Sequence, residues 1–472
     1  MTSTETTPTA TLPARVTPEL IARLTARVRA GGDTDARAPF TLTEVYTGAA
    51  YGELPQSRPE DVAAAFATAR AAQRTWAATP LKQRLAVFAR AHELILTERT
   101  LIADLIQIGC GKARRMAFEE SCDVPMIISH YLKTARRILK PRKHGGTVPL
   151  LSTSIEEHRP KGVIGVIAPW NFPFALALSD AVAALIAGNA VVLKPDNKTA
   201  LCALFGVELF HRAGLPEGLF EVVCGEGPDI GGDLIDNSDF VMFTGSTATG
   251  RLIGERAGRN LIGCSLELGG KNPLIVLDDA DLDAVIPGAV FATFANSGQA
   301  CMHIERIYVH DRVYEEFLRR FVEAAAELGA KAGASYDYTP EFGSLISPDT
   351  SPGSRRTWKK RGPRARPCTP AAGPARTSAR PSTSRPCSPT SPRTSRTPPP
   401  RPSDRSSPST GSAPSRKRST APMPPNTDST RACGVRIGPG RCGSRAGWRP
   451  GTSISTTVSS PATPPRQPRR AG

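Results

Sequence analysis

The composition of the chain changes near residue 350, and this change limits where a folded core can form. Residues 351–472 contain no Leu, Phe, Tyr, Glu or His, and they hold 24 of the 44 prolines. They carry 25 Lys and Arg but only 2 acidic residues, whereas residues 1–350 carry 35 basic and 41 acidic residues. A segment with so little apolar surface cannot offset the entropy lost on folding. The sequence therefore predicts a mildly acidic folded body and a disordered basic tail rich in Pro, Ser and Arg.

The net charge of +17 therefore belongs to the tail and does not make the body a nucleic-acid binder. Such a tail could neutralise phosphates without sequence preference. It has no repeat, however, and Trp358 and Trp448 are its only aromatic residues. We expect no specific nucleic-acid partner.

The remaining composition is typical of a cytoplasmic protein. The N-terminal residues are polar and contain no apolar run of the kind found in a signal sequence, and no uncharged apolar run in the sequence reaches the length of a membrane span. The ten cysteines show no CxxC pair and no regular spacing, which favours free thiols in a reducing compartment. We expect a cytoplasmic chain with no metal centre and no membrane partner.

From Lys161 onward, short apolar strands alternate with helices. The strands include "GVIGVIAPW", "AVVLKP" and "FVMFTG", and the helices include "FALALSDAVAALIAGN". Strands without polar alternation are typical of a parallel sheet covered on both faces. A helical stretch precedes this region, and runs of Thr, Val and Ile bounded by Gly and Pro predict a hairpin at 146–157. The predicted fold class is α/β, with a doubly wound parallel sheet.

Three polar residues lie where catalysis could use them. Cys301, in "FANSGQACMHIER", follows small and polar residues that could leave a thiol accessible. Glu267 ends an apolar strand in "CSLELGGKNP", a setting that would suit a general base. The turn "APWNFPFAL" restricts Asn171, so its amide could donate to an oxyanion. The structural alternatives are an inert buried cysteine, a strand-end glutamate in water and an asparagine that closes its own turn.

Two strand ends carry residues suited to a phosphate or a ribose. In "FTGSTATG", Gly245 and Ser246 lie between a strand and a helix, whose first N–H groups could bind a pyrophosphate. The glycine spacing is not the dinucleotide fingerprint, so an ordinary capped turn is the alternative. Lys194 ends a buried strand in "VVLKPDNKTA", at the edge of the sheet where ligands bind. A solvated lysine is the alternative there.

Taken together and in order, five segments resemble the aldehyde dehydrogenase superfamily: "PWNFP", "LKPDNKT", "FTGSTATG", "LELGGKNP" and "NSGQAC". The resemblance runs from about residue 42 to 348, and the wider segments look most like succinate-semialdehyde dehydrogenases of the NADP type from actinobacteria. It implies oxidation of a small aldehyde, with succinate semialdehyde as the first choice, to a carboxylic acid with NADP or NAD. An aromatic aldehyde is an alternative substrate.

The resemblance also implies roles for single residues. Cys301 would attack the aldehyde, and its backbone N–H with the Asn171 amide would hold the oxyanion. After hydride transfer leaves a thioester, Glu267 would activate water. The residues implied in cofactor binding are Trp170, Lys194, Asn197, Gly245, Ser246, Gly250 and Leu268.

Asn197 bears on the choice between NADP and NAD. Members of the family that prefer NAD usually have Glu at this position, three residues after the lysine. A carboxylate would repel the 2′-phosphate of NADP, whereas an amide would not. We therefore expect NADP to be accepted or preferred.

The resemblance divides the chain into segments with implied roles. It implies an N-terminal leader at 1–55, a cofactor-binding domain at 56–145 and 158–270, an oligomerisation-type hairpin at 146–157, a partial catalytic domain at 271–350 and the tail at 351–472.

The resemblance ends near "GSLISP". Family members continue with an E-x-F-G-P motif, whose Glu holds the nicotinamide ribose, and with a strand that joins the subunits of homo-oligomers. Residues 351–472 contain no Glu and cannot supply that ligand. A sequence rich in Ser, Pro and Arg is typical of a GC-rich gene translated in the wrong reading frame. We hypothesise a frame-shifted tail without the assembly strand, and an inactive truncated remnant is the alternative to an active enzyme.

Overall fold

The structure is a computed structural model, and it describes residues 12–31, 38–148, 152–347 and 436–439. The chain divides into two compact units, and every described residue belongs to the unit formed by 1–357 and 427–472. The predicted frame-shifted tail lies outside the described residues, except for the four residues 436–439. No helix in the described ranges is long and apolar enough to cross a membrane.

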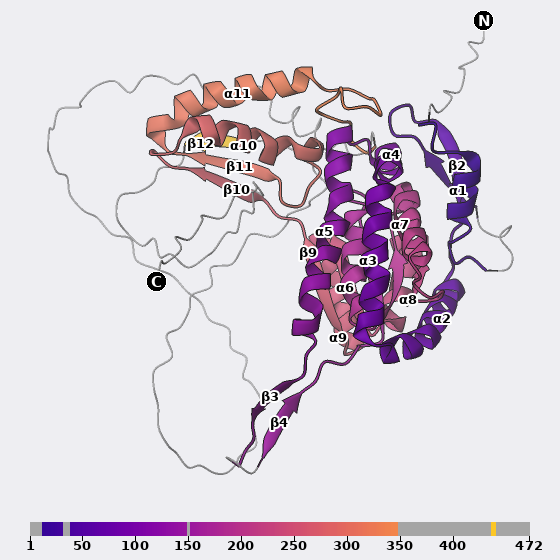
Figure 1. Ribbon diagram of the computed structural model, residues 1–472. Coiled ribbons are helices and arrows are strands. Elements are labelled where there is room, and N and C mark those ends of the chain that lie inside the picture. Colours follow the sequence, from indigo (N-terminus) through magenta and orange to yellow (C-terminus); the bar gives the residue numbers. More distant parts are fainter. Residues whose placement is uncertain (1–11, 32–37, 149–151, 348–435, 440–472) are drawn as a thin grey trace, which may run out of the picture. The chain divides into compact units, whose positions relative to one another are not determined.

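A five-stranded parallel sheet forms the larger part of the fold (Figure 1). Its strand order is β7-β6-β5-β8-β9. Every residue of β6 is buried, as are four of the five residues of β5. Because successive side chains of a strand point to opposite faces, this burial shows that helices cover both faces. The predicted α/β class is confirmed. The strands are β5 (Val163–Ile167), β6 (Ala190–Lys194), β7 (Phe220–Val222), β8 (Phe240–Gly245) and β9 (Gly263–Leu268).

Eight long helices accompany this sheet, and three of them, α3, α4 and α5, lie alongside one another (Figure 1). Helix α4 ends at Gly111, whose φ of +70° is the left-handed conformation that commonly terminates helices. The chain can therefore turn sharply before α5 begins. The helices are α2 (Pro59–Ala78), α3 (Leu81–Thr97), α4 (Arg99–Cys110), α5 (Arg114–Ile138), α6 (Ala175–Ile186), α7 (Ala200–Arg212), α8 (Gly227–Asn237) and α9 (Thr247–Arg259), with a 3₁₀ turn η2 (Asn197–Thr199).

The described part of the N-terminal leader is packed rather than loose. It forms α1 (Pro18–Thr25) and an antiparallel pair, β1 (Phe40–Thr43) and β2 (Ala50–Leu54). Leu24 of this helix is fully buried in the main core. Arg23 donates to the buried Glu208 carboxylate on α7 at 3.1 Å. The leader is therefore part of the same folded body.

The hairpin begins earlier than the sequence predicted. Its strands are β3 (Arg142–Gly145) and β4 (Thr153–Glu156), paired antiparallel with Arg142 opposite Glu156. All eight residues are exposed. The first strand has no buried side chains that would require an alternation of apolar and polar residues, so its sequence does not reveal it. Residues 149–151 at its tip lie outside the described ranges.

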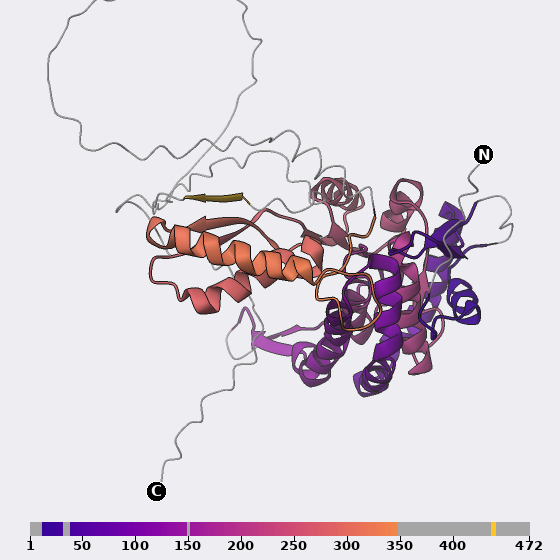
Figure 2. The same cartoon turned by 90° about the horizontal axis from the view of Figure 1, so that it is seen from above.

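A second parallel sheet carries the region after residue 271. Its strands are β10 (Asn272–Val276), β11 (Ile304–Val309) and the short β12 (Arg436–Pro439), in that order. Helices α10 (Leu282–Phe294) and α11 (Tyr314–Ala330) pack together on one face of β10 and β11, where they form a separate core (Figures 1 and 2). Two 3₁₀ turns, η3 (Ala295–Gly298) and η4 (Asp311–Val313), flank β11. The last strand was not expected, because the sequence predicted no structure in the tail.

Candidate active site

The three catalytic candidates line one pocket. It has a volume of about 120 Å³. It lies where the loop after β5, the ends of β8 and β9, and the loop before β11 meet. These are carboxyl ends of parallel strands together with the approach to the second sheet, a usual place for a ligand site. Its principal lining residues are Trp170, Asn171, Gly245, Ser246, Glu267, Gln299, Cys301 and His303.

Cys301 follows a turn with unusual backbone geometry. Three successive residues, Asn296, Ser297 and Gly298, have φ values of 52°, 58° and 75°. This left-handed region is sparsely populated by residues other than glycine, and such strain persists only where the surroundings impose it. On the other side of the cysteine, the Asn272 side chain donates to the carbonyl of Cys301 at 2.8 Å and to that of His303 at 3.0 Å. The loop is thus fixed both before and after the thiol.

The Cys301 thiol is accessible but not activated by its surroundings. The residue is exposed, while the other described cysteines are half-buried or buried. Partial desolvation raises the pKa of Cys301, and the negative charge of Glu267 raises it further. A thiol of this kind needs a proton acceptor before it can attack. The structural alternative, an inert buried cysteine, describes Cys110 and Cys224 better. Burial raises the pKa of each of these thiols to about 12.

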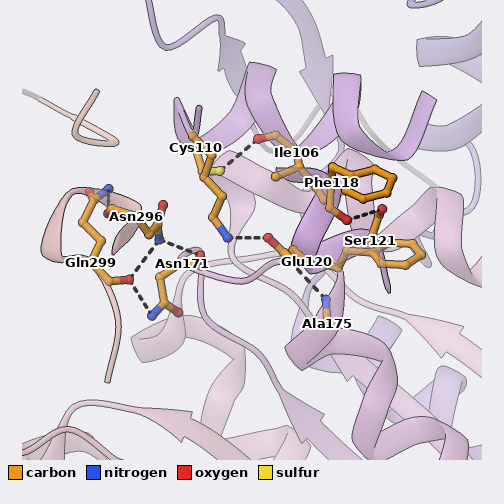
Figure 3. A network of polar contacts seen from close by, with 11 residues as sticks. Ile106, Cys110, Phe118, Glu120, Ser121, Asn171, Ala175, Asn296 and Gln299 are labelled. Atoms are coloured by element: carbon orange, nitrogen blue, oxygen red, sulfur yellow. Dashed lines mark hydrogen bonds and ion pairs between the residues drawn. The ribbon is translucent and has the colours of Figure 1, made fainter. Parts of the chain in front are cut away.

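Asn171 is held by two residues of the cysteine loop. Its side-chain Nδ2 donates to the backbone carbonyl of Gln299 at 3.0 Å, and its backbone carbonyl accepts from Asn296 Nδ2 at 3.1 Å (Figure 3). Nδ2 carries a second hydrogen, for which no acceptor exists among the described residues. The amide is therefore oriented by one N–H and keeps the other for a ligand.

Glu267 lies on β9 opposite Thr244 of β8. Its side chain is exposed, so the apolar setting that we expected for it is not found. Its charge reaches Asp180 on α6, a residue that the sequence did not single out. Burial and, to a lesser degree, Glu267 raise the pKa of Asp180 to about 6. A second carboxyl group, that of Asp180, is therefore close enough to be affected by the charge of Glu267.

A larger pocket of about 830 Å³ lies between α8 and α9. Lys194 lines it, with its ammonium group donating weakly to the Pro195 carbonyl at 3.4 Å. Ser246 belongs to the smaller pocket and caps α9, because its Oγ accepts from the Thr249 N–H at 3.1 Å. The N–H groups of a helix start attract anions. The two pockets together could hold an extended, phosphate-bearing ligand.

Gly250 and Leu268 line neither pocket. A Cβ added at Gly250 would lie 2.6 Å from a methyl carbon of Leu268, so these two residues pack α9 against β9. Gly245 has a similar constraint, since its Cβ would lie 2.5 Å from the ring of Phe243. The structure shows a packing contact between Gly250 and Leu268, and their implied part in cofactor binding stays a prediction.

Asn197 is buried and also lines neither pocket. Its Nδ2 donates to Gln56 Oε1 at 3.1 Å and to Glu226 Oε1 at 3.0 Å. Its Oδ1 is buried without a partner among the described residues. The sequence analysis missed Glu226, which precedes α8 and places a carboxylate beside the residue thought to discriminate between cofactors.

The described residues contain no group of three or more His, Cys, Asp or Glu side chains that could hold a metal ion.

Comparisons with known proteins agree with this arrangement. A provisionally named succinate-semialdehyde dehydrogenase (NADP+) from Mycolicibacterium smegmatis is 47% identical over 317 residues, covering 67% of this chain and 61% of the relative. A vanillin dehydrogenase from Amycolatopsis sp. is 38% identical over 312 residues, covering 63% and 60%. The chain thus spans less than two thirds of the length of these relatives. The NAD+ complex of an aldehyde dehydrogenase from Bacillus cereus matches with a TM-score of 0.67 at 29% identity, covering 73% of this chain and 72% of that one.

The family model described as "Aldehyde dehydrogenase family" matches residues 33–359, more than half of the chain. The resemblance deduced from the five motifs is confirmed, and this chain belongs to the aldehyde dehydrogenase family.

Proposed function

We propose that this chain oxidises a small aldehyde to a carboxylic acid, with Cys301 as nucleophile and NADP or NAD as hydride acceptor. The observation that carries the proposal is the common pocket of Cys301, Glu267 and Asn171, which also contains the start of α9 at Ser246. A thiol, a carboxylate and a free amide N–H are the groups that thioester chemistry requires.

The chemistry follows from the roles of these groups. Glu267 takes the thiol proton, and the Cys301 sulfur adds to the aldehyde carbon. The second N–H of Asn171 and the Cys301 backbone N–H stabilise the oxyanion. The bound nicotinamide supplies the acceptor for the hydride that leaves this carbon. Glu267 passes the thiol proton on to solvent and, as a carboxylate again, deprotonates a water molecule that hydrolyses the Cys301 thioester and releases the acid.

The residues present suit a nicotinamide dinucleotide. Lys194 in the larger pocket would bind a ribose, and the start of α9 at Ser246 would bind the pyrophosphate. Trp170 lines the smaller pocket and would contact the nicotinamide. The amide at Asn197 favours NADP, whereas the nearby Glu226 carboxylate opposes its 2′-phosphate. We propose that both cofactors are used.

For the substrate we propose succinate semialdehyde, supported by the name of the 47% identical relative. The vanillin dehydrogenase relative supports an aromatic aldehyde as the second candidate. Reduction of NADP and NAD with each aldehyde, followed by absorbance of the reduced nicotinamide, tests both. We expect activity that Cys301→Ser abolishes and that the matched variant Cys122→Ser retains. Equal activity of the two variants would refute the nucleophile.

A second candidate function is cofactor binding without turnover. It is favoured by the sequence, because residues 351–472 contain no glutamate that could contact the nicotinamide ribose. This form would bind NADP in a fluorescence titration and form a Cys301 adduct with aldehydes, yet it would release no acid.

A further inference from the structure

We propose that the buried ion pair of Lys112 and Glu120 positions Asn171 for oxyanion binding. Neither residue belongs to the pocket described above. The inference rests on the proposed function of Asn171, and it concerns how the turn that carries this residue is held. Lys112 lies in the turn between α4 and α5, and Glu120 lies on the second turn of α5.

The pair is completely enclosed. The Lys112 ammonium group contacts Glu120 Oε2, and both side chains have 0% exposure. The Lys112 carbonyl accepts from Tyr46 Oη at 3.0 Å and from Gln107 Nε2 at 3.0 Å. The Lys112 backbone is therefore anchored to the body of the fold, and its ammonium group is directed toward Glu120.

Both charges contact the segment that immediately follows Asn171. The second carboxylate oxygen of Glu120 accepts from the N–H groups of Phe174 at 2.8 Å and Ala175 at 3.2 Å, at the start of α6 (Figure 3). The Lys112 ammonium lies 3.6 Å from the centre of the Phe172 ring. A carboxylate thus satisfies helix N–H groups that would otherwise lack partners, and a cation covers the neighbouring ring.

Stability alone does not explain this arrangement. Removing two charges from water is costly, and well-packed apolar residues in place of a buried pair are often equally stable. What an apolar pair cannot do is accept the two N–H groups at the start of α6. The pair is therefore best understood as fixing the backbone at 172–175.

This fixed backbone is one of two supports for Asn171. The other is the cysteine loop, through the Gln299 carbonyl and the Asn296 amide. With the following residues held by the ion pair and the side chain held by the loop, the second N–H of Asn171 has a defined direction. Loss of the pair would leave the loop contacts to hold a mobile turn.

The first test is local hydrogen exchange in the full chain. We expect Glu120→Gln to accelerate exchange of the amides of Phe172, Phe174 and Ala175, while the neighbouring control Glu119→Gln, exposed on the same helix, leaves them unchanged. Exchange at 172–175 that Glu120→Gln does not alter would overturn the proposal, whatever the enzyme does.

The second test measures oxyanion binding without turnover. An aldehyde that forms an adduct with Cys301 protects this thiol from iodoacetamide, as quantified by peptide mass spectrometry with succinate semialdehyde as the probe. We expect Glu120→Gln to raise the half-protecting aldehyde concentration about tenfold, the effect of one lost hydrogen bond to a charged group. In an Asn171→Ala background it should have no further effect. An equal loss in both backgrounds would show a merely structural role.

A further variant separates positioning from folding. Lys112→Met combined with Glu120→Leu removes both charges and keeps apolar packing, so only the Phe174 and Ala175 N–H groups lose their partner. We expect a lower melting temperature with thermal unfolding that is still cooperative, and weak protection by aldehyde. Normal protection in this variant would contradict the proposal. Absence of protection in the unaltered chain would instead refute the proposed aldehyde chemistry, and hydrogen exchange would still decide the role of the ion pair.

Discussion

The thiol of Cys301 lies near a carboxylate, and this neighbour controls its acid–base behaviour. Desolvation and the Glu267 charge both raise the pKa of Cys301. The carboxylate therefore opposes the formation of a thiolate until it accepts the proton itself. The neutral form of the Cys301 thiol is therefore favoured in this pocket.

We expect Glu267→Gln to lower the pKa of Cys301, because it removes the negative charge that opposes ionisation. The pH–rate profile of iodoacetamide labelling at Cys301 should shift toward lower pH. Labelling of the half-buried Cys122 in the same samples serves as the reference. A profile that stays in place or moves to higher pH would show that the carboxylate does not act on the thiol.

Glu226 is the residue that should set the balance between the two cofactors. It lies 3.0 Å from the Asn197 amide, close to where a 2′-phosphate is expected. We expect Glu226→Gln to strengthen NADP binding several-fold relative to NAD, and this gain should shrink at high salt. Fluorescence titrations with both cofactors measure it, and the exposed Glu217→Gln is the control. Stronger NAD binding with unchanged NADP binding would contradict this role.

At the scale of single residues, motifs predicted the pocket better than its supports. Cys301, Glu267 and Asn171 lie in short segments with distinctive neighbours, so the sequence could single them out. Glu226 and Asp180 lie in ordinary helical or turn sequence, and only the fold brings them near the site. No local pattern could have indicated them.

Among the elements, helix α9 depends on the absence of a side chain at one position. Gly250 lets the helix approach β9, where Leu268 would collide with any added Cβ. Gly258 lies on the same helix, and a Cβ there would have no neighbour within 4 Å. The two glycines therefore provide a matched pair.

We expect Gly250→Ala to destabilise the fold by about 1–3 kcal/mol through overpacking. Gly258→Ala should stabilise it by about 0.5–1 kcal/mol, since alanine loses less backbone entropy in a helix. Urea unfolding of the two variants measures both changes. Equal effects of the two substitutions would mean that contact with Leu268 does not limit the packing of α9.

Helices and buried strands were predictable from apolar periodicity, but exposed strands were not. The hairpin strand at 142–145 has the sequence "RKHG" and no buried side chain, so nothing in its pattern distinguishes it from a loop. Nothing in the sequence of the turn between α4 and α5 indicated that it contacts the site either. Its importance depends on Lys112 meeting Glu120 and Phe172, a contact that only the packed structure creates.

In the molecule as a whole, the described helices cover only one face of the second parallel sheet. Ile275 of β10 and Tyr308 of β11 are partners in the strand register, and they are 53% and 42% exposed. Parallel sheets usually have both faces covered. This face therefore presents apolar surface to solvent.

We expect the chain to bind an apolar fluorescent dye such as anilinonaphthalene sulfonate at this face. The substitutions Ile275→Lys and Tyr308→Lys should lower the dye fluorescence markedly. Leu261→Lys is the control, because Leu261 is 93% exposed but lies in the turn after α9. Equal losses from all three substitutions would mean that the dye does not report on the sheet.

The contact between Asn171 and Gln299 joins residues 128 positions apart. Every strand of the five-stranded sheet precedes Cys301 in the chain. All residues of that sheet are therefore synthesised before the cysteine. Closure of so long a loop is slow compared with local helix formation. The contact that orients the Asn171 side chain can therefore form only after Gln299 has been made, which is later than the contacts within the five-stranded sheet.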